Sequence, residues 1–195
     1  AVLDVLRRIG GQPARRSSAG PGTVDSLGAA DDELARWSGE YGEPGRRHPK
    51  ERPSALVWLG HGRRGTMGPA LLVPGSAERG DYAQLTPDLF AHHLYAEWGN
   101  RRAAEGHWAM VVIEACKSSD FAKVVRERFD RSAAMDDAPY SILLIATGKD
   151  AAQAYLGTFR ETLEDYLDAL TSHDVFELHE LRRFFKQAGH FCEFG

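Results

Sequence analysis

The chain has 195 residues, of which 43% are hydrophobic and 27% are charged, and its formal net charge is −4. This length and composition are typical of a globular protein with one well-shielded core. The slightly acidic balance gives no reason to expect a nucleic-acid partner. The longest apolar run, Trp108–Ile113, is far shorter than the roughly 20 residues that span a bilayer, so we expect no membrane association. Two cysteines, Cys116 and Cys192, are too few for a disulfide framework and predict a reducing, cytoplasmic setting.

The first 53 residues differ from the rest in composition. The apolar spacing from Val2 to Ile9 predicts a short helix, and Ala29–Trp37 predicts a second one. Two stretches rich in Gly, Pro and charge, "GGQPARRSSAGPG" and "GEYGEPGRRHPKERP", have the composition of mobile linkers. We therefore separate an N-terminal segment, residues 1–53, from a domain over residues 54–195. The alternative is that residues 1–53 are an incomplete part of the same domain.

From residue 54 onward, predicted strands alternate with predicted helices. Three apolar runs predict buried strands: Leu56–Leu59, Trp108–Ile113 and Ile142–Ile145. A short piece between two prolines, Ala70–Val73, is predicted as extended. Each predicted helix has a start or stop signal: Thr86 before Pro87 with a stop at Gly99, Ser118 or Ser119 as a cap, the box Thr158–Glu161, and Gly189 after Leu178–Phe185. Such alternation predicts an α/β fold, a three-layer α/β/α sandwich with a mostly parallel central sheet.

The first buried strand runs into Gly60-His61-Gly62-Arg63-Arg64-Gly65, which matches the dinucleotide-binding fingerprint G-x-G-x-x-G. That fingerprint requires a helix at the third glycine, because the helix N-terminus holds the pyrophosphate. Here Gly68-Pro69 follows and prevents a helix over those positions. We therefore expect no nucleotide cofactor, and the histidine between the glycines becomes the candidate functional residue.

A cysteine follows the second buried strand, in Glu114-Ala115-Cys116-Lys117-Ser118. Parallel strands end at the same edge of a sheet, and α/β proteins have their sites at that edge. We therefore expect His61 and Cys116 to lie near each other. A single cysteine at a strand end is otherwise a small buried hydrophobe, and this alternative stays open for Cys116 taken alone.

The two stretches "ALVWLGHG" and "AMVVIEACKSSDF" together resemble the paired signature of the caspase-like (clan CD) cysteine peptidases, in the branch of metacaspases and bacterial caspase homologues. The separation of 55 positions between His61 and Cys116 is close to the roughly 50 of caspases. The resemblance covers residues 54–188. The chain departs from the family pattern after the cysteine, where Ser118-Ser119-Asp120 contains no glycine, and upstream, where no first strand is evident.

The resemblance implies a His–Cys dyad. Cys116 is the nucleophile, and His61 polarises the thiol or protonates the leaving amine. The N–H groups of Gly62 and Cys116 form the oxyanion hole.

The resemblance also implies a specificity residue, since metacaspase-like enzymes have an acidic residue two positions before the cysteine. Glu114 occupies that position, and a buried carboxylate there favours substrates cleaved after Arg or Lys. Asp150 resembles a second acidic residue of the pocket. The alternatives are that Glu114 pairs with a local Arg or Lys, and that Asp150 is a solvated loop residue.

The sequence thus predicts a cysteine endopeptidase that cleaves proteins or peptides after basic residues, as a regulated module of a larger protein. Arg47, Lys50 and Arg52 in the second linker are candidate sites of self-processing. We expect no bound metal and leave calcium activation open. The alternative is a non-catalytic caspase-like assembly module. Neither G-x-S-x-G nor a P-loop occurs, which argues against a hydrolase of the serine type and a nucleotide-binding domain.

Overall fold

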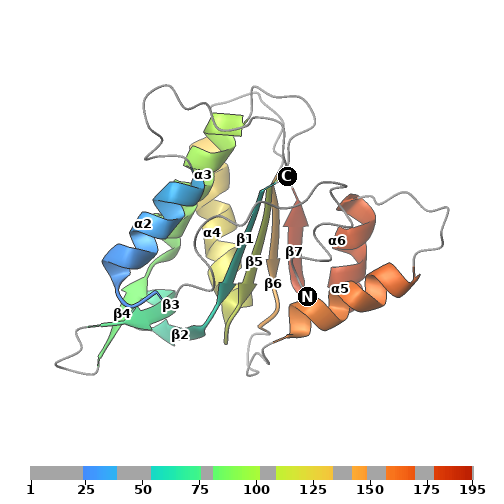
Figure 1. The fold of residues 1–195 in the computed structure, drawn as a ribbon, viewed down its shortest axis with the longest axis horizontal. Coiled ribbons are helices and arrows are strands. Elements are labelled where there is room, and N and C mark those ends of the chain that lie inside the picture. Colours follow the sequence, from blue (N-terminus) through green and yellow to red (C-terminus); the bar gives the residue numbers. More distant parts are fainter. Residues whose placement is uncertain are drawn as a thin grey trace.

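A four-stranded, mostly parallel sheet forms the centre of the molecule (Figure 1). The computed structural model describes residues 24–38, 54–75, 81–101, 109–133, 142–148, 157–169 and 178–194. The order across the sheet is β1-β5-β6-β7, with β1, β5 and β6 parallel and β7 antiparallel to β6. The strands are β1 (Ser54–Leu59), β5 (Ala109–Glu114), β6 (Ile142–Ala146) and β7 (Phe191–Phe194).

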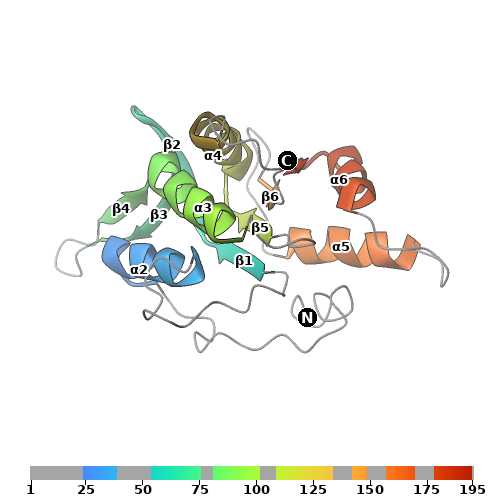
Figure 2. The same cartoon turned by 90° about the horizontal axis from the view of Figure 1, so that it is seen from above.

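Helices lie against both faces of this sheet, which makes the protein a mixed α/β fold (Figure 2). On one side lie α3 (Pro87–Arg101) and α4 (Ser118–Ala133), with α2 (Leu27–Ser38) packed against α3. On the other side lie α5 (Thr158–Ala169) and α6 (Leu178–Gln187). No helix in the described ranges combines the length and the apolar character that crossing a bilayer requires.

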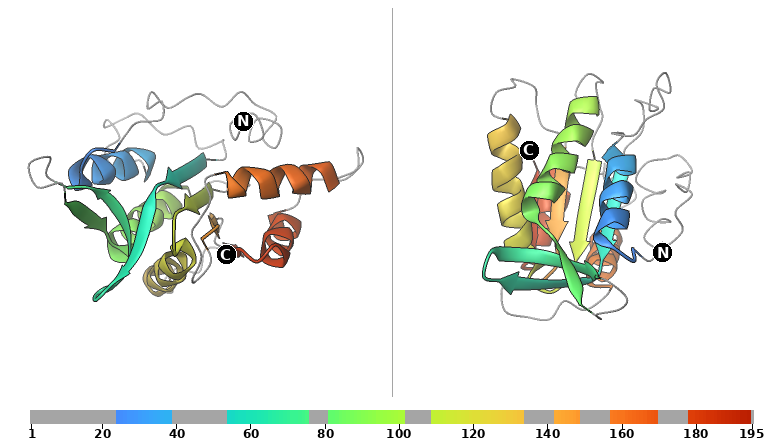
Figure 3. Two further views of the ribbon diagram at one scale, coloured as in Figure 1. Left: turned by 90° about the horizontal axis from the view of Figure 1, so that it is seen from below. Right: turned by 90° about the vertical axis from the view of Figure 1, so that its left-hand side faces the viewer.

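A second, antiparallel sheet extends from the end of β1 (Figure 3). Its order is β2-β3-β4, formed by β2 (His61–Gly65), β3 (Gly68–Pro74) and β4 (Tyr82–Leu85). Gly68 has φ 110°, a conformation that a side chain would strain, and it lets β2 turn directly back into β3. The stretch after Gly65 is therefore strand and not helix, as Gly68-Pro69 predicted.

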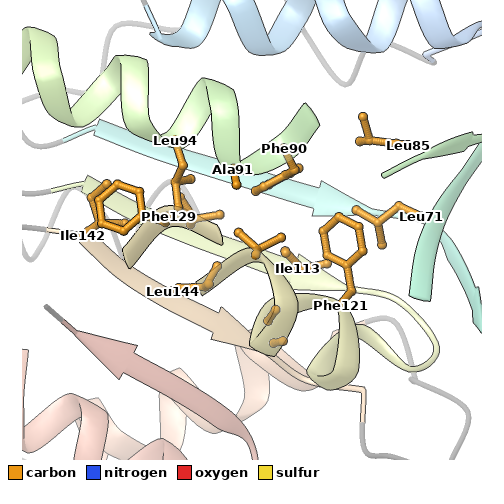
Figure 4. Close-up of a cluster of buried hydrophobic side chains, with 14 of the residues drawn as sticks. Leu71, Leu85, Phe90, Ala91, Leu94, Ile113, Phe121, Phe129, Ile142 and Leu144 are labelled. Carbon is orange, nitrogen blue, oxygen red and sulfur yellow. The ribbon is translucent and has the colours of Figure 1, made fainter. Parts of the chain in front are cut away.

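The buried strand β5 separates two hydrophobic clusters. Val111 and Ile113 point into a cluster with α3 and α4, where Phe90, Phe121 and Leu144 surround them (Figure 4). Met110 and Val112 point into a second cluster under α5 and α6. All four β5 side chains named here are fully buried, and each contributes roughly 1.5–3 kcal/mol of transfer free energy. Coverage on both faces explains why this strand is a continuous apolar run.

The described part of the N-terminal segment belongs to the first of these clusters. Leu34 of α2 is buried in it. On the same helix, Asp31 Oδ1 lies 2.7 Å from Nε2 of the buried His93 of α3. The helix predicted from Val2 to Ile9 and the two linkers lie outside the described residues.

The helix ends confirm some sequence signals and contradict others. The N–H of Leu89 donates to Thr86 Oγ1 at 3.3 Å, so Thr86 caps α3 as predicted. Gly99 does not end α3, which continues to Arg101; a single glycine costs a helix only about 1 kcal/mol, which a fifteen-residue helix can tolerate. Gly189, with φ 81°, follows α6 and confirms the predicted stop.

Candidate active site

The parallel register places the ends of β1 and β5 side by side. Leu59 is paired with Glu114, and the N–H of Gly60 donates to the carbonyl of Glu114 at 3.1 Å. His61 follows Gly60 directly, begins β2, and has an exposed side chain. Two residues after Glu114 comes Cys116, whose side chain is half-buried. The structure therefore brings together the two strand ends that carry the predicted histidine and cysteine.

Gly62 packs directly on the backbone of the cysteine loop. A Cβ atom at position 62 would overlap the carbonyl oxygen of Cys116 and would touch Cβ of Ala115 at 3.4 Å. Only glycine permits this approach, which explains the residue after His61.

The backbone N–H of Gly62 points toward the open edge of β2. Pro69 has no N–H, so its pair with Arg64 is not hydrogen-bonded, and pairs in an antiparallel ladder alternate. The pair of Gly62 with Leu71 is then also non-hydrogen-bonded, which directs the Gly62 N–H away from β3. In the described part of the chain, no backbone acceptor binds the N–H of Cys116 either. Both predicted oxyanion donors are thus available.

The cysteine loop has a strained conformation. Lys117 has φ 57°, the left-handed region that costs a non-glycine residue roughly 1–2 kcal/mol. The N–H of Ser118 donates to the carbonyl of Ala115 at 3.2 Å and closes a tight turn around Cys116. Strain of this kind persists only where the surroundings hold the loop.

Gly148, which follows β6, holds the loop from the other side. Its N–H donates to Ser118 Oγ at 2.8 Å, and its carbonyl accepts from the N–H of Ser119 at 3.0 Å and from Ser119 Oγ. A Cβ at Gly148 would overlap the carbonyl oxygen of Ala115. The sequence interpretation missed Gly148; the available signal was a glycine just after the third buried strand. It also took Ser118 or Ser119 as the cap of α4, whereas both hydroxyls bind Gly148.

Glu114 is 4% exposed, and its carboxylate binds the start of α5. The N–H of Phe159 donates to Oε1 at 2.7 Å, and the N–H of Gly157 donates to Oε2 at 3.2 Å. A carboxylate at a helix N-terminus is stabilised by unpaired N–H groups and by the helix dipole. Within the described ranges Glu114 forms no salt bridge, so the alternative of a local Arg or Lys partner finds no support there.

The second cysteine has a different environment. Cys192 of β7 is fully buried opposite Ile145, and burial, with a smaller effect of the neighbouring Glu193, raises the pKa of its thiol to about 12. Such a thiol is inert at neutral pH. Of the two cysteines, only Cys116 is accessible for reaction.

The remaining predicted site residues fall outside the described part of the chain. These are Asp150 and the candidate processing positions Arg47, Lys50 and Arg52. Among the residues that are described, no group of three His, Cys, Asp or Glu side chains is placed to hold a metal ion.

The chemical capacity of the site follows from its groups. An accessible thiol, an exposed imidazole and two unpaired N–H groups are the components needed to attack a carbonyl and to stabilise the resulting oxyanion. Within the described chain, no hydrogen bond joins His61 to Cys116. Catalytic hydrogen bonds often form only when the substrate is bound. Comparison with protein-family models, with curated proteins and with solved structures returned no match.

Proposed function

We propose that the protein is a cysteine endopeptidase with the three-layer α/β/α fold of the caspase-like clan. The observation that carries the proposal is the contact of Gly62 with the carbonyl of Cys116, because it sets the His61 strand end directly against the cysteine loop. A protein that used these strands only for assembly has no need of an accessible thiol in a strained loop or of an exposed imidazole at the adjoining strand end.

In the proposed reaction, the thiolate of Cys116 attacks the scissile carbonyl, and a C–S bond forms as the carbonyl oxygen becomes an oxyanion. The N–H groups of Gly62 and Cys116 donate to that oxyanion, each worth about 3 kcal/mol of barrier in comparable sites. The C–N bond then breaks, and the imidazolium of His61 gives its proton to the leaving amine. Water hydrolyses the thioester that remains and restores the thiol.

We propose further that cleavage follows Arg or Lys. The carboxylate of Glu114 is buried beside the cysteine loop, and its two hydrogen bonds to α5 leave acceptor positions free. A substrate cation would supply the charge partner that it lacks within the described chain. Asp150 remains a candidate second acidic residue, and cleavage after Arg47, Lys50 or Arg52 would then make self-processing possible.

The test combines peptide cleavage with thiol labelling. Fluorogenic peptides ending in Arg, Lys, Asp or Ala are assayed with the wild type, Cys116→Ala and His61→Ala, with and without calcium. We expect cleavage after Arg and Lys and a loss of more than about 10³-fold in kcat/KM in either variant. Cys192→Ala is the matched control and should keep its activity. Iodoacetamide should label Cys116 and spare Cys192, as read by mass spectrometry.

The outcomes separate the parts of the proposal. Cleavage only after Asp would overturn the role of Glu114 and leave the dyad intact. Rapid labelling of Cys116 without cleavage of any peptide or protein would favour the assembly module.

A further inference from the structure

The small antiparallel sheet has one face toward the core and one face away from it. Residues paired across antiparallel strands point to the same side. Gly62 pairs with Leu71 and Leu71 with Leu85, and both leucines are buried in the core cluster. Arg64 shares this side of β2, and its guanidinium lies 3.8 Å from Asp120 of α4. His61 and Arg63 therefore point to the opposite side.

We call this opposite side the outer face; its described residues are His61, Arg63, Gly65, Gly68, Ala70, Leu72, Pro74, Tyr82 and Gln84. Ala70, paired with Arg63, is only 3% exposed. A Cβ atom added to Gly65 would lie 3.8 Å from Oε1 of Gln84 and 3.9 Å from Nε of Arg63. The side chains of Arg63 and Gln84 thus converge over Gly65, two residues along β2 from Arg63.

The outer face carries unbalanced positive charge. Arg63 is exposed, and it forms no ion pair with any described residue, whereas the adjacent Arg64 faces Asp120. No carboxylate is found among the described residues of the outer face. The guanidinium of Arg63 and the amide group of Gln84 both carry N–H donors, and N–H donors match a carboxylate.

The chemistry of the proposed peptidase decides which part of a substrate meets this face. The acyl carbon binds to Cys116, and the leaving nitrogen must reach His61 to be protonated. The peptide that follows the scissile bond therefore continues past His61. Arg63 lies two positions farther along the same face, about 7 Å at the rise of a β-strand, which corresponds to two residues of extended peptide.

We propose that the outer face binds the substrate chain after the scissile bond, and that Arg63 with Gln84 selects an Asp or Glu two or three residues beyond that bond. This proposal rests on the proposed cysteine peptidase activity. Combined with Glu114, it defines a substrate with a basic residue before the cleaved bond and an acidic residue shortly after it.

The test uses three internally quenched peptides that differ only at the second and third residues after the scissile bond. Both of these residues are Asp in one peptide, Ala in another and Lys in the third. The residue before the bond is whichever the first assay shows to be cleaved fastest. We expect wild-type kcat/KM to be about fivefold higher with Asp than with Ala, as for an exposed ion pair, and lowest with Lys. Arg63→Ala should abolish the difference, and Arg63→Glu should reverse it in favour of Lys.

Arg64→Ala is the matched control, since it removes the same charge from the other side of the strand and should keep the preference for Asp. Arg63→Lys retains the positive charge and should keep most of the preference for Asp. Equal cleavage of the three peptides by the wild type would overturn the proposal while the peptidase stands, and so would an Asp preference that survives Arg63→Glu. Failure to cleave any peptide would overturn the peptidase and this proposal together.

Discussion

At the scale of single residues, two glycines determine the shape of the cysteine loop. Gly62 and Gly148 flank the cysteine loop, and at each position a Cβ would overlap a loop carbonyl. The two contacts hold Lys117 in its left-handed conformation from both sides. The position of the Cys116 thiol is thus determined by backbone packing.

Gly62→Ala should lower the proposed peptidase activity about 10²-fold while the protein remains folded. The added methyl group overlaps the carbonyl of Cys116, so the loop must shift by about 1 Å, and a shift of that size can lower catalysis about 10²-fold. The measurement is kcat/KM together with the thermal unfolding midpoint. Gly28→Ala in α2 is the matched control, because nothing lies within 4 Å of its Cβ position. It should raise stability slightly and leave activity unchanged. Full activity in Gly62→Ala would contradict the close packing.

The sequence was informative about some of these residues and silent about others. His61 and Gly62 were predicted because a glycine-flanked histidine after an apolar strand is a local pattern. Gly148 was missed because its partners, Ser118 and Ser119, lie about thirty positions earlier in the chain. A local pattern contains no information on which distant backbone will come close.

At the scale of elements, the cysteine strand and α5 form one unit. Glu114 at the end of β5 supplies the acceptors for the first N–H groups of α5, forty-three and forty-five positions later in the chain. The start of α5 at Thr158 was predicted from Thr158 and Glu161, but the contribution of Glu114 was not. When the capping group belongs to another element, the sequence of the helix contains no signal for it.

Glu114→Gln should weaken this connection. An amide can accept from one of the two N–H groups but presents its own N–H groups to the other, so we expect the free energy of unfolding to fall by about 1–2 kcal/mol. Urea unfolding measures the change. Glu164→Gln, an exposed position on the same helix, is the control and should stay within about 0.5 kcal/mol. If Glu114 also recognises substrate, cleavage after Arg should fall more than cleavage after Ala. Unchanged stability would contradict the capping role.

At the scale of the whole molecule, the alternation of apolar strands and amphipathic helices predicted the parallel strands β1, β5 and β6 and the helices from α3 to α6, and α2 was predicted separately from Ala29–Trp37. The peripheral strands β2, β4 and β7 were not predicted. They are short, and β2, with the sequence HGRRG, has no apolar alternation. Pairing with a neighbouring strand stabilises them, and pairing is a property of the assembled fold.

The edge strand β7 is tied to α6 by charge, which affects the stability of the whole fold. Lys186 and Arg182 both bind the carboxylate of Glu193, at 2.5 and 2.6 Å. Burial acts to raise the pKa of Glu193, but the hydrogen bonds and charges of these two cations outweigh it and lower the pKa below its ordinary value of 4.5.

A lowered pKa stabilises the folded state at pH values above 4.5, and this stabilisation is lost as the pH falls through the folded-state pKa. We therefore expect the thermal unfolding midpoint to decrease as the pH is lowered below 4.5. Glu193→Gln should be less stable than the wild type at pH 7, by about 1 kcal/mol or less, and the two should converge in acid. Thermal unfolding between pH 7 and 3 measures both. A constant difference across that range would contradict the role of Glu193.

The glycines of the cysteine loop also limit how this protein can change over evolution. A lineage that lost its thiol or its imidazole would still need Gly62 and Gly148, because the two positions support the fold of the loop whatever chemistry it carries. Divergence would instead enter through positions such as Arg63 and Gln84, whose side chains lie on the surface of the small sheet. Descendants would therefore change first on the surface of the small sheet, and only later in the shape of the cysteine loop.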